Sequence, residues 1–144
     1  IHNYKTKPYP YKSYLSIIIK IMVKRTSKLI HKNKTILKEM KIATNPFELA
    51  NGLMFASKKK VDKGICLCLP SSKDVKFGAA ITMLFCFHSQ DTLFVNSNFE
   101  VVDKKLLKPW NPSYTPKEAC KYVIETTAGK LDNISIGDKV KFEL

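Results

Sequence analysis

The sequence contains little arginine, histidine and glycine. Arg25 is the single arginine among 25 basic residues, and the chain has three histidines and five scattered glycines. Arginine makes the planar, bidentate contacts that read bases, whereas lysine is a point charge. Phosphate-binding loops need clustered glycines, because their backbone must approach the phosphate closely. These absences argue against a base-reading nucleic-acid-binding protein and against a Gly-rich nucleotide site.

The four cysteines lack the paired Cys-x-x-Cys spacing of a structural zinc site. Cys66 and Cys68 lie two residues apart in an apolar run, so on a strand both side chains point to one face. Buried, reduced thiols behave as small hydrophobes, and reduced cysteines are typical of an intracellular compartment. We therefore expect no metal site, no cofactor and a cytoplasmic location.

Residues 1–21 differ from the rest of the chain, because they are basic, interrupted by prolines and free of acidic residues. Their apolar stretch at 15–19 is broken by Lys20 and is far shorter than the roughly 18 residues needed to span a bilayer. No small-residue cleavage site follows it. Met22 opens a segment that resembles an ordinary protein start. We expect residues 1–21 to be a disordered extension or a mis-assigned start, and residues 22–144 to form a single domain.

The formal net charge of the chain is +13, from 25 basic and 12 acidic residues. A basic surface attracts phosphate backbones and releases their counterions. A chain rich in Lys, Ile and Asn is also typical of an AT-rich coding sequence, which loads any solvated surface with lysine. The charge thus fits either an ordinary surface or a weak association with nucleic acid through the charged loop expected at Lys58–Lys63.

The middle of the chain is its most informative region. Residues 81–87 are apolar on both faces, which is typical of a central buried strand. Two further apolar runs, 92–95 and 99–103, follow polar bends at 88–91 and 96–98. Three apolar runs joined by tight polar turns predict an antiparallel meander. We expect its polar bends to meet at one rim of the sheet.

Shorter signals flank this region and set the fold class. Strands are predicted at 26–32 and 35–43, and a helix begins at Asn45-Pro46, because asparagine is a good N-cap and proline suits the first helical position. Thr115 with Glu118 forms a capping box that predicts another helix. We expect a mainly β fold (α+β at most): a compact antiparallel β-sandwich or closed barrel-like sheet with two or three short helices.

Four ordered segments together resemble a known family. They are Gly52-Leu53-Met54-Phe55, the run 81–85 with Asp91 and Phe94 downstream, the stretch from Val101 to Trp110, and Tyr122–Glu125 with Ala128-Gly129 and Ile136-Gly137-Asp138. In order and spacing they resemble domain of unknown function 192, especially its archaeal branch, over residues 22–144. The resemblance implies a mainly β, sandwich-like fold and implies no activity. The chain departs from the family pattern in having Thr82 where archaeal members often have histidine.

The candidate binding residues are polar or aromatic side chains on bends and loops. Trp110 and Tyr114 lie in a proline-stiffened loop, and a rigid loop that displays aromatic faces loses little entropy on binding. An alternative is that Trp110 folds back as a lid over the sheet. His88 and Asp91 belong to the first polar bend and Asp103 ends the third run, so we expect all five residues to line a ligand site at one rim.

No catalytic residues are expected. Cys86 and His88 share a strand face, but same-face neighbours on a strand are about 7 Å apart at the backbone, too far for a catalytic dyad. The leading hypothesis is a non-enzymatic binding module for a small molecule or a protein partner, as a monomer or weak dimer with no membrane span. The alternatives are a lysine-driven nucleic-acid-associated protein and a small hydrolase.

Overall fold

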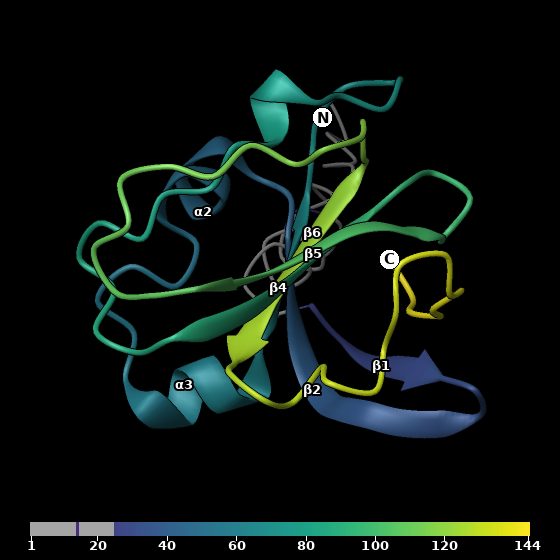
Figure 1. Ribbon diagram of the computed structural model, residues 1–144, viewed down its shortest axis with the longest axis horizontal. Helices are drawn as coiled ribbons and strands as arrows, with labels where there is room; N and C mark the ends of the chain where they lie inside the picture. Colours follow the sequence, from purple (N-terminus) through teal and green to yellow (C-terminus); the bar gives the residue numbers. More distant parts are fainter. Residues whose placement is uncertain (1–13, 15–24) are drawn as a thin grey trace, which may run out of the picture.

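A computed structural model describes residue 14 and residues 25–144 of the chain. The predicted extension at 1–21 lies, apart from Tyr14, outside the described residues. Residues 25–144 form, in chain order, β1 (Thr26–His31), β2 (Lys34–Ala43), α2 (Pro46–Asn51), α3 (Lys58–Lys63), β3 (Ile65–Cys68), the 3-10 turn η1 (Phe77–Ala79), β4 (Gln90–Val95), β5 (Val101–Leu107) and β6 (Tyr122–Thr127). The prediction of a mainly β fold is confirmed (Figure 1).

The strands form one sheet in the order β1-β2-β3-β6-β4-β5. All neighbours are antiparallel except β2 and β3, which run parallel, so the sheet is mixed. The segment after β6 bridges both edges, at Ile30 through Lys141 and at Glu100 through Lys139. These bridges are isolated, and the sheet is not closed into a barrel. The closed alternative therefore does not hold.

Each face of the sheet is covered by its own apolar layer. The hairpin of β1 and β2 and the C-terminal segment supply Leu29, Met40 and Phe142 to one core cluster, which packs on Leu93 and Ile124. The helices and the turn after α2 cover the other face, where Leu53 of the turn and Val61 of α3 pack in one cluster with the strand residues Ile65, Phe94 and Val123. Figure 1 shows α2 and α3 on one side of the sheet and the C-terminal segment on the other.

Several elements predicted from local sequence signals are present in the structure. The hairpin of β1 and β2 turns at Lys32 and Asn33, which both have positive φ, as a tight hairpin turn requires. The Asn45 side chain accepts a hydrogen bond from the Glu48 amide at 2.8 Å and so caps α2 as predicted. The pairing of β4 with β5 confirms the second hairpin of the expected meander.

The central strand predicted at 81–87 is absent. Ile81 makes one isolated bridge with Tyr114, and the chain then turns, with the Cys86 amide donating to the Met83 carbonyl at 3.1 Å. Phe85 has a φ of 59°, which no extended strand allows. The Pro-rich segment 109–114 pairs with this segment instead of a strand, and Phe85 and Phe87 are exposed while Met83 and Cys86 are buried.

One segment predicted as a loop is a helix, and one predicted helix does not form. Lys58–Lys63 is not a loop but α3, because the Ser57 side chain accepts from the Lys60 amide and Val61 is buried against the sheet. Thr115 to Glu118 forms no helix, because the Lys117 amide donates to the buried Asp103 carboxylate at 3.0 Å. In both places a contact with the sheet decides the local structure.

Candidate ligand-binding site

The face of the sheet beneath α2 carries three adjacent polar side chains. Thr92 of β4 pairs with Glu125 of β6, and Gln90 lies two residues before Thr92. Cross-strand partners and residues two apart point to the same face, so all three side chains lie on one side of the sheet. All three are buried. Burying a polar group without a hydrogen-bond partner costs free energy. Three such groups side by side in an apolar layer therefore indicate a binding site.

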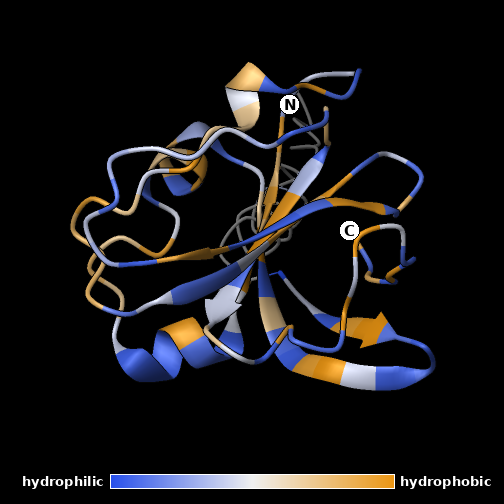
Figure 2. Cartoon of the chain, in the orientation of Figure 1, coloured by the Kyte–Doolittle hydropathy of each residue, from blue (hydrophilic) through white to orange (hydrophobic). Residues whose placement is uncertain are grey.

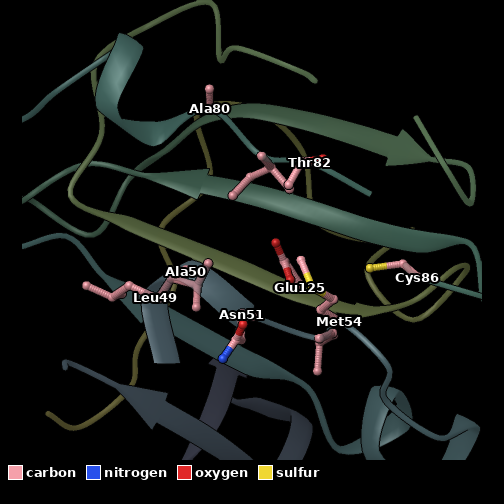
Figure 3. Close-up of a pocket in the computed structure, with 12 residues that line it drawn as sticks. Leu49, Ala50, Asn51, Met54, Ala80, Thr82, Cys86 and Glu125 are labelled. Atoms are coloured by element: carbon pink, nitrogen blue, oxygen red, sulfur yellow. The ribbon is translucent and has the colours of Figure 1, made fainter. Parts of the chain in front are cut away.

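A cavity of about 60 Å³ lies between these strands and α2. Its walls are residues 49–54 of α2 and the following turn, Leu67 of β3, the segment 80–82, Cys86 and Glu125. In Figure 3 the Glu125 carboxyl lies among these side chains, with Thr82 above it, Met54 below it and Cys86 to the right. One water needs roughly 10–15 Å³ measured in the same way, so the cavity has room for a small ligand group.

Glu125 is the chemically distinctive residue of this cavity. Its side chain is 4% exposed, and burial raises its pKa to about 7. Among the described residues no group donates a hydrogen bond to its carboxyl and no basic side chain pairs with it. A carboxyl with this pKa is close to half-ionised at neutral pH, so it can either donate or accept a hydrogen bond there.

Gly52 lies beside the Glu125 carboxyl in the cavity wall. The residue ends α2 with a φ of 49°, a conformation that side chains rarely adopt. A Cβ added at this position would lie 3.4 Å from Glu125 Oε2. That distance is an ordinary van der Waals contact, so the backbone conformation, which turns the chain after the helix, is what requires glycine at this position.

Two further polar atoms beside Glu125 lack partners. Gln90 Oε1 and Thr92 Oγ1 are buried, and neither has a hydrogen-bond partner in the described part of the chain. Leaving such an atom unsatisfied costs about 1–3 kcal/mol. The Cys86 thiol lies near Glu125 and Gln90. Burial raises its pKa, the charge of Glu125 adds to the rise, and a hydrogen bond with Gln90 lowers it. Gln90 Oε1, Thr92 Oγ1 and the Glu125 carboxyl are thus buried acceptors to which no described group donates a hydrogen bond.

An exposed aromatic patch, formed by Phe55, Phe85, Phe87 and Trp110, lies on the loops beside the cavity. Phe55 follows the cavity residue Met54, and Phe85 and Phe87 flank Cys86. The rings contact one another, with centroids 5.1 Å apart for Phe55 and Phe85 and 5.3 Å apart for Phe85 and Trp110. Figure 2 shows these loops as hydrophobic segments at the left edge of the molecule. Trp110 is half exposed, at 50%, and lies edge-on to its neighbours.

The backbone beneath the aromatic patch is strained. Phe55, Phe85 and Trp110 have φ values of 58°, 59° and 65°. Such angles are uncommon for bulky residues and cluster at functional sites, where the surrounding structure enforces them. Here the Phe55 amide donates to the Phe85 carbonyl at 2.9 Å, and the Trp110 amide donates to the Met83 carbonyl at 3.0 Å. The loops are therefore tied together in a way that displays aromatic side chains to solvent.

The structure brings together only Asp103 and Tyr114 of the five predicted site residues. The Tyr114 hydroxyl donates to Asp103 Oδ2 at 2.7 Å, and the Lys117 amide donates to the same oxygen. Burial raises the pKa of Tyr114, and Asp103 adds to the rise, to about 12. Their polar groups satisfy one another, so this pair holds the loop after β5 in place.

Asp91, His88 and Trp110 lie elsewhere. Asp91 is on the strand face of Leu93, and its Oδ2 accepts from the amides of Gly129 and Leu131 at 2.9 and 3.1 Å. Asp103 pairs with Phe94 and so lies on the opposite face. The bends at 88–89 and 96–98 stand at the two ends of β4, so the expectation that they meet at one rim is wrong. A ligand-binding role for these residues stays a prediction.

Sequence reasoning missed the cavity residues Glu125 and Gly52 as a site. Both belong to segments that carry the family resemblance, yet neither segment contains a catalytic or metal-binding motif. The available signal was Glu125 itself, an acidic residue within the β-branched run Val123-Ile124-Glu125-Thr126 of a central strand. Among the described residues no three His, Cys, Asp or Glu side chains lie close enough to hold a metal ion.

Solved structures share the architecture of this mainly β domain. A protein of unknown function from Novosphingobium aromaticivorans superposes with a TM-score of 0.69 and 19% identity, covering 81% of this chain and 83% of its own. A protein of Sinorhizobium meliloti, described as a candidate transcription regulator, gives a TM-score of 0.67 and 21% identity, covering 83% and 94%. At these identities the similarity shows the fold alone.

The sequence relatives are archaeal. A UPF0127 protein of Thermococcus sibiricus is 37% identical over 78% of this chain and 71% of its own length. A UPF0127 protein of Pyrococcus horikoshii is 38% identical over 72% of this chain and 87% of its own. The model of the family DUF192, described as "Uncharacterized ACR", matches residues 28–142. The chain belongs to the DUF192 family, and the resemblance noted in its sequence is confirmed.

Proposed function

We propose that this domain is a non-enzymatic binding module, and that its ligand occupies the cavity beneath α2 and contacts the Glu125 carboxyl. The observation that carries the proposal is the burial of this carboxyl, 4% exposed, in a cavity wall with no partner among the described residues. A buried charged or polar group without a partner is strongly unfavourable. Such groups cluster at functional sites, where a ligand can supply the missing contact.

Binding is favoured over catalysis because no nucleophile is activated near the cavity. The Cys86 thiol has a pKa raised by burial and by Glu125, so it is protonated and weakly nucleophilic at neutral pH. The part of the chain that the structure describes places no histidine in the cavity wall. A hydrolase would need a nucleophile beside its base, and Glu125 lacks that arrangement.

The test uses methionine methyl groups as reporters in nuclear magnetic resonance. Met54 lines the cavity, whereas Met40 lies in the core on the opposite face of the sheet. We expect at least one member of a panel of n-butanol, n-butylamine and butyrate to shift the Met54 methyl resonance saturably and leave Met40 unchanged. If no panel member moves Met54 more than Met40, the proposal is wrong.

Association with nucleic acid is the second hypothesis. The lysines of α3 are partly neutralised, because Lys58 pairs with Asp62 and Lys63 pairs with Glu39. We expect any association to be weak and steeply lost with salt, which a titration of binding against salt concentration measures.

Among the described residues no helix is long and apolar enough to cross a membrane. The partner, the oligomeric state and the cytoplasmic location stay predictions.

A further inference from the structure

The wall of the cavity beneath α2 is acidic, whereas the chain as a whole is basic. The formal net charge is +13, yet the cavity wall contains one carboxyl group and no lysine or arginine. Gln90 Oε1 and Thr92 Oγ1, which lack partners in the described part of the chain, lie on the same face of the sheet as Glu125, behind the cavity wall, and can both accept hydrogen bonds. An electronegative cavity inside a basic protein is complementary to a ligand that brings positive charge and several donors.

The size of the cavity limits what can enter. Its volume of about 60 Å³ is roughly four times the space that one water requires. Leu53, Met54 and Leu67 form apolar walls around the polar floor. A compact ammonium group with a short alkyl stem fits this combination, because its N–H donors meet the Glu125 carboxylate while the stem packs on the aliphatic side chains. A guanidinium group is larger and needs a planar, bidentate partner.

We propose that the ligand carries a primary alkylammonium group, which enters the cavity and pairs with the Glu125 carboxylate. This inference rests on the proposed function and names the chemistry of its ligand. When Glu125 is protonated before binding, its carboxyl proton is released to solvent as the ion pair forms, so charge and protons balance. The aromatic patch supports the same assignment, because the electron-rich faces of exposed rings beside Met54 and Cys86 attract cations toward the cavity.

The first experiment compares probes of equal size and different charge. n-Butylammonium should shift the Met54 methyl resonance with an affinity at least about tenfold higher than n-butanol, since a charged hydrogen bond to a carboxylate is worth more than a neutral one. Butyrate should not bind. Raising the pH from 6 to 8 should strengthen amine binding about tenfold, because the ionised fraction of Glu125 rises with a pKa about 7. Binding of n-butanol should not change with pH.

Two variants separate the carboxylate from general effects. Glu125→Gln should weaken n-butylammonium binding to the level of n-butanol, while Glu118→Gln, at an exposed carboxyl, should leave it unchanged. Equal binding of amine and alcohol in the native protein would overturn the ammonium assignment while leaving the proposed binding function intact. No shift of Met54 with any probe would overturn both.

A further arm distinguishes the two sources of an alkylammonium group. Nα-acetyl-lysine methylamide presents the ammonium on a side chain with a blocked backbone, whereas n-butylamine is a free amine. Tighter binding of the lysine derivative identifies a protein or peptide side chain as the source. Tighter binding of the free amine identifies a small metabolite. Both results support the ammonium assignment, and failure of both amines to outcompete n-butanol contradicts it.

Discussion

At the scale of the residue, the account depends on the ionisation of Glu125. Its side chain is packed between strands and α2 and is almost fully buried, so bulk water solvates the carboxylate poorly. Burial accordingly raises the pKa from the ordinary value of 4.5 to about 7. The protonated acid is therefore the main form of the folded chain below pH 7 when no cation is present.

This preference predicts a pH dependence of stability. Folding raises the pKa of Glu125, so the stability conferred by its protonated form is complete below pH 4.5 and is lost as the pH rises through 7. Glu125→Gln mimics the protonated acid at every pH. Relative to native protein, the variant should gain about 3 kcal/mol in the free energy of unfolding between pH 4.5 and pH 8.

Urea denaturation at several pH values measures this difference. Glu118→Gln is the matched control, because it removes an exposed carboxyl and should follow the native protein at every pH. A constant difference between Glu125→Gln and the native protein across the range would mean that the Glu125 carboxyl is solvated or paired in solution.

At the scale of the element, local sequence signals decided some segments and contacts with the sheet decided others. The Asn45 cap and the turn at Lys32 and Asn33 are local, so their helix and hairpin were predictable. Residues 81–87 read as a buried strand because sequence does not distinguish an apolar core run from an apolar surface run. In the structure Phe85 and Phe87 belong to the exposed aromatic patch while Met83 and Cys86 are buried, and backbone hydrogen bonds tie the segment to residues 109–114.

The segment around Thr115 offers a test of this distinction. Asp103 is fully buried and accepts hydrogen bonds from the Tyr114 hydroxyl, the Lys117 amide and the Lys104 amide. Asp103→Asn places an amide donor against these donors, so it should lower the free energy of unfolding by about 1.5–3 kcal/mol. Thr115→Ala, which removes the unused capping residue, should change it by less than about 0.5 kcal/mol.

Chemical denaturation of the two variants beside the native protein gives both values. A larger loss for Thr115→Ala than for Asp103→Asn would mean that a capped helix exists at 115–118 in solution. Such a result would also show that Asp103 does not hold the loop after β5 in place.

At the scale of the whole molecule, one open mixed sheet separates two apolar layers, and the candidate site belongs to the layer beneath α2. The mainly β class and the family were predictable because turn residues and strand runs recur in order along the chain. The site was not, because Glu125, Gly52 and Cys86 come from three distant segments and meet only through the strand order. A single domain over residues 22–144 stays a proposal.

The most direct test is a titration of the Glu125 carboxyl by carbon-13 nuclear magnetic resonance of the native protein. We predict a pKa about 7 in the free protein and a clear fall when n-butylammonium is present, because the cation stabilises the ionised form. A pKa near 4.5 that does not respond to the amine would contradict the account, since it would show that Glu125 is neither buried without a partner nor a contact for a cationic ligand.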